Sequence, residues 1–74
     1  MIRIEVDPFP TDEQLGPLWV AAWGSTPAGG YADKVLKRSL AHVGAYDVDR
    51  IVGFVNVAWD GGVHAFLLDT TVHP

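Results

Sequence analysis

Two apolar runs joined by a tight turn constrain the fold of this chain more than any other feature. Residues 51–59 are apolar on both sides of a strand except at Asn56, which is typical of a strand in the middle of a sheet. The Asp-Gly-Gly sequence at 60–62 supplies the positive φ values that a hairpin needs. Residues 63–72 then form a second, largely apolar run. The sequence therefore predicts an antiparallel strand pair in its C-terminal third.

The first six residues predict another strand. Ile2, Ile4 and Val6 alternate with Arg3 and Glu5, which is the period of a half-buried strand.

A first helix is predicted to begin near Thr11. Thr11 and Gln14 have the spacing of a capping box, in which each side chain accepts a hydrogen bond from the other residue's backbone N–H. Pro17 predicts a kink, or a helix that becomes regular only after it. The apolar residues that follow the cap share one stripe, which predicts that they all face the core: Leu15, Leu18, Trp19, Ala22 and Trp23.

A second helix is predicted from Tyr31 to Ala41 or His42. Its apolar face would hold Ala32, Val35, Leu36, Ser39, Leu40 and Val43, and its polar face Asp33, Lys34, Lys37, Arg38 and His42. The residues between the helices, 24–30, are rich in Gly and predict a mobile loop. Residues 43–46 predict a short strand, and residues 47–50 predict a turn.

Length and composition limit the class of protein. Seventy-four residues with 49% apolar content and no Cys predict one small domain over residues 1–74 without disulfides. A net charge of −4, with five dispersed basic residues, argues against nucleic-acid binding. The apolar runs are too short to span a bilayer, and the charges among the first residues do not fit a signal peptide. We therefore expect a cytoplasmic protein with no membrane partner.

Asp69 is the strongest candidate for chemistry from the residues alone. It interrupts an otherwise apolar strand, where partial burial would raise its pKa and suit it to act as a general base. The alternative is that Asp69 bonds a neighbouring backbone group or Thr hydroxyl at a strand irregularity. His64, Asp69 and His73 lack the spacing of metal ligands, so no metal site is predicted.

Trp23 and Tyr31 bracket the predicted loop and could line a pocket. The place of Trp23 on the apolar stripe favours the core instead. A small-ligand pocket walled by Trp19, Trp23 and Trp59 is a further alternative, although tryptophans are ordinary core residues.

The predicted order strand–helix–helix–strand–strand–strand resembles the N-terminal half of a GNAT-superfamily N-acetyltransferase. The segments that carry the resemblance are RIVGFVNV at 50–57 and LLDTTVHP at 67–74, joined by the short Asp-Gly hairpin. The implied fold is α+β: about four antiparallel strands with two helices on one face, which is half of a GNAT fold. The function it implies is acetyl transfer from acetyl-CoA to an amine.

The resemblance also implies roles for individual residues. Backbone groups of Thr70, Thr71 and Val72 would bind the pantetheine arm of acetyl-CoA. Trp23 and Tyr31 would lie at the mouth of the acceptor pocket, and Asp69 would take the proton from the amine.

The family's pyrophosphate-binding loop, an Arg/Gln-x-x-Gly-x-Gly/Ala motif after the fourth strand, does not occur in the sequence. No Lys or Arg follows Arg50, so no side chain there replaces the cationic part of that site. We therefore expect the isolated chain to be inactive and to bind no acetyl-CoA by itself. We also expect homo-oligomers that form through the uncovered sheet face or the fourth-strand edge. The alternative function is a non-catalytic dimerising or partner-binding module derived from that fold.

Overall fold

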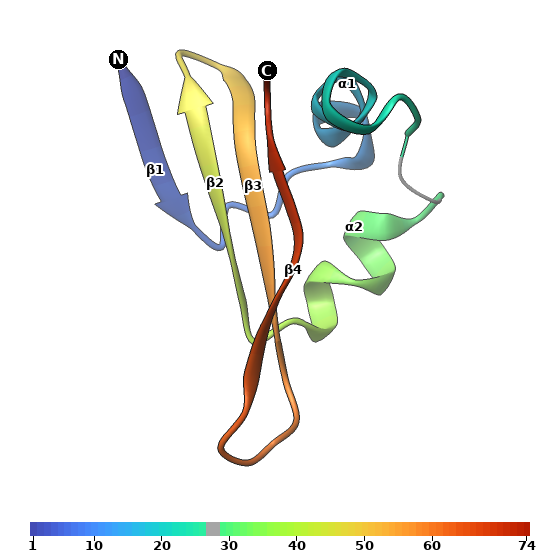
Figure 1. Cartoon of the computed structure of the whole chain (residues 1–74), viewed down its shortest axis with the longest axis vertical. Helices are drawn as coiled ribbons and strands as arrows, with labels where there is room; N and C mark the ends of the chain where they lie inside the picture. The colour runs from blue at the N-terminus through green and yellow to red at the C-terminus, as the bar shows by residue number, and fades with distance from the viewer. Residues whose placement is uncertain (27–28) are drawn as a thin grey trace.

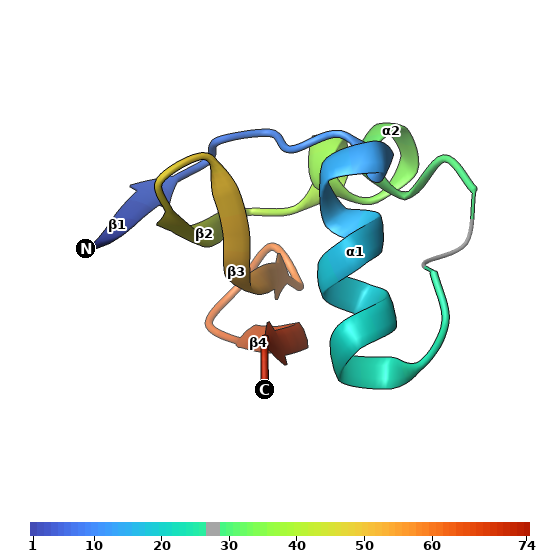
Figure 2. The same cartoon turned by 90° about the horizontal axis from the view of Figure 1, so that it is seen from above.

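The computed structural model describes residues 1–26 and 29–74 as a four-stranded sheet with helices on one face (Figures 1 and 2). The strands pair antiparallel in chain order, which confirms the predicted α+β fold. The predicted loop at 24–30 includes Pro27 and Ala28, which lie outside the described residues. The elements are β1 (Ile2–Val6), α1 (Asp12–Trp23), α2 (Tyr31–Lys34), the 3₁₀ helix η1 (Leu36–Arg38), β2 (Ala41–Asp47), β3 (Arg50–Trp59) and β4 (Ala65–Val72).

Helix α1 begins at the predicted capping box. The N–H of Gln14 donates to Thr11 Oγ1 at 3.1 Å, and the N–H of Thr11 donates to Gln14 Oε1 at 2.9 Å. The helix ends at Gly24, whose φ of 83° suits glycine. It runs through Pro17 without a break, so the expectation of a helix that is regular only after Pro17 is wrong. Pro17 is tolerated because Glu13, whose carbonyl loses its helical donor, is exposed to water.

The second helix is much shorter than predicted: α2 ends at Lys34 and the 3₁₀ helix η1 ends at Arg38, so neither reaches Ala41 or His42. Ser39 is extended, with a ψ of 151°, and its hydroxyl donates to the carbonyl of Leu36 at 2.9 Å. The N–H of Leu40 then donates to the carbonyl of Val57 in β3 at 2.9 Å. The hydrogen bond of the Ser39 side chain competes with helical hydrogen bonds, and the residues after Ser39 pair in the sheet instead.

His42 lies in β2 and is completely buried, so its predicted place on a polar helix face is wrong. Its Nε2 accepts a hydrogen bond from the N–H of Phe9 at 2.9 Å. Its backbone N–H donates to Asp7 Oδ1 at 2.8 Å, and its carbonyl accepts from the N–H of Asp7 at 2.7 Å. The imidazole therefore holds the connection from β1 to α1 against the sheet.

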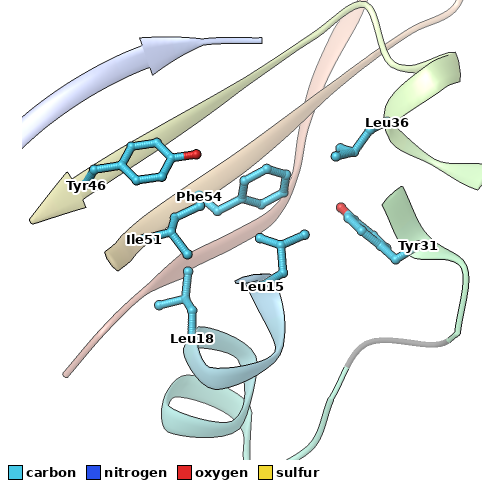
Figure 3. Close-up of a cluster of buried hydrophobic side chains, with 7 residues drawn as sticks. All are labelled: Leu15, Leu18, Tyr31, Leu36, Tyr46, Ile51 and Phe54. Atoms are coloured by element: carbon cyan, nitrogen blue, oxygen red, sulfur yellow. The ribbon is translucent and has the colours of Figure 1, made fainter. Parts of the chain in front are cut away.

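The core lies between the helices and the sheet. Leu15 and Leu18 of α1 point toward Ile51 and Phe54 of β3 (Figure 3). The ring of Tyr31 lies 5.3 Å from that of Trp19 and 6.2 Å from that of Phe54, measured between centroids. The buried apolar residues are Leu15, Leu18, Tyr31, Leu36, Tyr46, Ile51 and Phe54.

Strand β1 has the predicted alternation, but its apolar side faces away from the helices. Ile4 pairs with Ala45, and Val6 pairs with Val43, on the face of the sheet opposite to buried His42. Because both helices cover the other face, Ile2, Ile4 and Val6 are exposed and the prediction of a half-buried strand is wrong.

The two predicted turns between strands are present. Asp47 pairs with Arg50 across the first, and Gly61 has a φ of 84° in the second. Strand β4 starts at Ala65 and not at residue 63, because Asp60 Oδ1 accepts from the N–H of Gly62 at 2.7 Å and extends the turn. None of the described helices is long and apolar enough to span a membrane.

We predict that His42 makes folding stability pH-dependent. Burial lowers the pKa of His42, against a smaller opposing effect of Asp7, so the folded state keeps the imidazole neutral. The neutral imidazole of His42 therefore contributes fully to the free energy of unfolding above its unfolded pKa of about 6.5. This contribution is lost as the pH falls below that value, by at most about 1.4 kcal/mol per pH unit. Urea unfolding between pH 8 and pH 5 measures this loss.

The variant His42→Gln should lose this dependence between pH 5 and pH 7. The matched control is His73→Gln, since His73 is exposed and, among the described residues, its imidazole bonds only the carbonyl of Pro74. A wild-type stability that is constant over this range would contradict the prediction.

Candidate active site

A bulge in β4 positions Asp69. Leu68 pairs with Asn56 and Thr71 pairs with Phe54, so Asp69 and Thr70 together lie opposite Val55. Asp69 has a φ of 55°, a left-handed conformation that Asp tolerates better than most residues. The bulge turns its carboxylate toward α2.

The hydroxyl of Tyr31 holds this carboxylate. It donates to Asp69 Oδ2 at 2.8 Å, from the first residue of α2. Burial, together with the hydrogen bond and charge of Asp69, raises the pKa of Tyr31 well above its ordinary value. The phenol therefore stays protonated and remains a donor over the whole physiological range.

Thr71 connects the bulge to α1. Its side chain is buried, and its hydroxyl donates to the carbonyl of Asp69 at 2.8 Å. The same oxygen accepts a hydrogen bond from Trp23 Nε1 at 3.1 Å. Thr71 therefore bonds the backbone carbonyl of Asp69 at the strand irregularity, whereas the carboxylate of Asp69 bonds the hydroxyl of Tyr31.

Trp23 is 61% exposed, so its predicted burial in the core is wrong. It is the last residue of α1, where its indole reaches over β4 to Thr71 and not into the core. Its position agrees with the other interpretation, in which Trp23 lines a pocket.

That pocket is an open cleft of about 450 Å³ between the end of α1 and the end of β4. Strand β4 is at the edge of the sheet, so the cleft runs beside a strand edge. Its lining residues are Ala21, Ala22, Trp23, Thr70, Thr71, Val72 and Pro74.

The structure therefore brings all six predicted site residues together. Asp69, Thr70, Thr71 and Val72 share the end of β4, and Trp23 and Tyr31 each donate a hydrogen bond to this segment. The alternative pocket of three tryptophans does not form among the described residues. Trp19 packs on Tyr31, whereas Trp59 donates to the carbonyl of Gly62 in the β3–β4 hairpin.

A second cavity, of about 530 Å³, lies between the start of α1 and the β2–β3 hairpin, and it was not predicted from the sequence. Glu13 and Gln14 line it from the helix, and Asp47, Asp49 and Arg50 from the hairpin. It contains none of the predicted site residues. No sequence spacing marks this cavity, because elements far apart in the chain form its walls.

Two solved structures match this fold over nearly the whole chain. A protein of unknown function from meticillin-resistant Staphylococcus aureus, described as a probable acetyltransferase, matches 99% of the chain with a TM-score of 0.83 and 32% identity. A GNAT-family acetyltransferase from Streptococcus pneumoniae matches 100% of it with a TM-score of 0.78 and 27% identity. No family model and no curated protein matches the sequence.

The chain spans about half the length of these structures, 54% in each case. The match confirms the resemblance to the N-terminal half of a GNAT acetyltransferase in both fold and element order.

We predict that Tyr31→Phe destabilises the fold by about 1–2 kcal/mol, because it removes a hydrogen bond to a charged group and leaves the ring in place. Tyr46→Phe is the matched control: both tyrosines are 8% exposed, and no described residue bonds the hydroxyl of Tyr46. Its effect should stay within about 0.5 kcal/mol. Urea denaturation measures both, and equal effects would argue against the Tyr31–Asp69 bond.

Proposed function

We propose that this chain, which has the fold of the N-terminal half of a GNAT-family acetyltransferase, supplies part of a site that transfers an acetyl group from acetyl-CoA to an amine. The observation that carries the proposal is the arrangement around Asp69. A carboxylate held by Tyr31 lies beside a cleft at a strand edge, in a chain whose fold matches acetyltransferases.

The pantetheine arm is assigned to the backbone of Thr70–Val72. The edge position of β4 supports this assignment, because an edge strand presents N–H and C=O groups that an extended ligand can bond. The cleft of about 450 Å³ beside it has an apolar wall from Ala21, Ala22 and Trp23. An extended chain that carries amide groups fits a polar strand edge facing an apolar wall.

Asp69 is assigned the role of general base. Tyr31 occupies Oδ2, which fixes the carboxylate and leaves Oδ1 for the proton of an incoming amine. The amine nitrogen attacks the thioester carbonyl, a C–N bond forms, the C–S bond breaks, and CoA leaves as its thiolate, which then takes up a proton from solvent. Asp69 takes the proton that the nitrogen loses.

Trp23 and Tyr31 receive different roles near the acceptor. Trp23 is exposed at the cleft, where its indole can contact a bound molecule. Tyr31 is buried, so it orients Asp69 and does not contact the amine itself. Tyr31 is thus a positioning residue for the proposed reaction.

Acetyl-CoA binding by the isolated chain is expected to be too weak to support activity. Residues 51–74 contain no Lys or Arg, so β4 itself supplies no such side chain to pair with the pyrophosphate. The cytoplasmic location expected from the sequence is part of this proposal. The acceptor is assigned only as an amine.

A non-catalytic module that binds a second copy of itself is the other candidate function. The observation that favours it is the apolar face of the sheet away from the helices, on which Ile2, Ile4 and Val6 are exposed. Self-association through this face, or through the edge of β4, would account for an apolar surface of this size.

We predict that acetyl-pantetheine and acetyl-CoA bind the isolated chain with similar, millimolar affinity. In this proposal the pantetheine arm bonds the backbone of Thr70–Val72, whereas residues 51–74 supply no Lys or Arg to the pyrophosphate. Two-dimensional NMR should show shifts of the Thr70–Val72 amides and of the Trp23 indole N–H. Shifts confined to the cavity beside Arg50 would contradict the assignment.

We predict that Asp69→Asn lowers acetyl transfer by about 10²–10⁴-fold, the usual contribution of a general base. The assay needs a complete fold, so we suggest a chimera in which this chain replaces the matched half of the Streptococcus pneumoniae acetyltransferase. Asp60→Asn is the matched control, since Asp60 lies in the distant β3–β4 hairpin. A chimera whose rate is unchanged by Asp69→Asn at every pH would exclude Asp69 as the base.

A further inference from the structure

The side chain of Thr71 is buried at the end of β4, and the proposed reaction uses only the backbone of this residue. The side chain belongs to a residue that is only 2% exposed. Thr71 pairs with Phe54 of β3, whose ring belongs to the core. Buried hydroxyl groups in proteins have hydrogen-bond partners, and both partners of this one lie in the candidate active site. These partners indicate what the hydroxyl does.

The chemistry of the bonded groups fixes the direction of both hydrogen bonds of Thr71. The indole N–H of Trp23 is only a donor, so it donates to Thr71 Oγ1, at 3.1 Å. The backbone carbonyl of Asp69 is only an acceptor, so it takes the single proton of the Thr71 hydroxyl, at 2.8 Å. The hydroxyl therefore connects the last residue of α1 to the bulge in β4.

The backbone conformation of Asp69 needs a support of this kind. Its φ of 55° is left-handed, which costs free energy in residues other than glycine and persists only where the surroundings hold it. Asp69 and Thr70 share the position opposite Val55, and a bulge locally disrupts the ladder between its two strands. The hydrogen bond from Thr71 to the carbonyl of Asp69 stabilises the chain at this point.

We propose that the hydroxyl of Thr71 positions the base of the acetyl transfer by holding the bulge at Asp69. The inference rests on the proposed function, in which Asp69 is that base. Thr71 holds the backbone of Asp69 at its carbonyl, and Tyr31 holds the carboxylate at Oδ2. Because the carbonyl carbon and the side chain are attached to the same Cα, a fixed backbone sets the direction from which the carboxylate reaches Tyr31. Thr71 is thus a positioning residue, since its buried hydroxyl acts through Asp69.

Two substitutions separate this role from simple packing. Thr71→Val keeps the branched shape of the side chain and removes the hydroxyl, so it deletes both hydrogen bonds. Thr71→Ser keeps the hydroxyl and removes the methyl group. If the hydroxyl holds the bulge, the valine variant disturbs Asp69 and the serine variant does not. If packing holds it, the serine variant disturbs Asp69 as well.

NMR spectroscopy of the whole chain, without any coenzyme, tests the conformational part of the inference. The three-bond coupling between the amide and α protons of Asp69 reports its φ. In Thr71→Val we expect this coupling to shift toward the value of an extended strand, and the indole N–H of Trp23 to exchange faster with solvent. Thr71→Ser should keep the wild-type coupling. Thr26→Val is the matched control: it makes the same change at an exposed threonine and should alter neither signal.

An Asp69 coupling that Thr71→Val leaves unchanged overturns the inference. A Thr71→Ser variant that shifts the coupling as much as Thr71→Val also overturns it, because packing would then set the bulge. If Thr71→Val fails to fold by circular dichroism, Thr71→Ala takes its place, since it puts no methyl group beside the freed N–H of Trp23. The same two outcomes then apply to Thr71→Ala.

Kinetics of the chimera with the Streptococcus pneumoniae acetyltransferase test the link to catalysis. Thr71→Val should lower kcat by about 10–10²-fold, because a displacement of a reacting group by about 1 Å costs up to about 10²-fold. It should change the KM for acetyl-CoA much less, and Thr71→Ser should restore most of the lost kcat. An unchanged kcat in Thr71→Val, in a chimera that Asp69→Asn inactivates, overturns the inference. If Asp69→Asn has no effect, the proposed function fails, and the coupling at Asp69 still decides whether Thr71 holds the bulge.

Discussion

The side chain of Tyr31 joins the hydrophobic core to the candidate active site. Its ring packs between Trp19 and Phe54, so it belongs to the contact that holds the helices on the sheet. Its hydroxyl emerges at the end of that contact and binds the carboxylate of Asp69. The geometry at Asp69 therefore depends on core packing, and not on a surface loop. A carboxylate oriented in this way spends little conformational entropy when a ligand binds.

The sheet distributes its apolar residues over two faces, although the described helices cover only one of them. On the covered face, buried His42 and Asn56 lie among apolar groups, and Nε2 of the imidazole accepts the hydrogen bond that fixes the connection from β1 to α1. The opposite face has apolar side chains and no such polar contacts at its centre. The apolar side chains of the sheet therefore lie partly in the core and partly on a surface that the described helices leave uncovered.

Local signals in the sequence were sufficient to predict the order of elements, the capped helix start at Thr11, both turns and an irregular strand around Asp69. Their determinants are a few neighbouring residues, such as Thr11 with Gln14 or Asp60 with Gly61. The predictions that failed, the end of the second helix and the buried side of β1, depend on contacts between residues far apart in the sequence. Periodicity could not reveal that β3 draws residues from Leu40 onward into the sheet, nor which face the helices would cover. The assignment of Thr70, Thr71 and Val72 came from the family resemblance and that of Asp69 also from its place in an apolar strand, whereas the bond from Tyr31 to Asp69 spans 38 positions and left no local pattern.

The order of the strands has a consequence for folding kinetics. β2 to β4 form two consecutive hairpins, whose contacts are local in sequence and close quickly. β1 joins this meander only when the chain closes over the helices, and the bond from His42 to Asp7 spans 35 positions. Loop-closure entropy makes such a contact late. Mutations at Asp7 or His42 should therefore mainly accelerate unfolding, whereas changes in the β3–β4 hairpin slow folding.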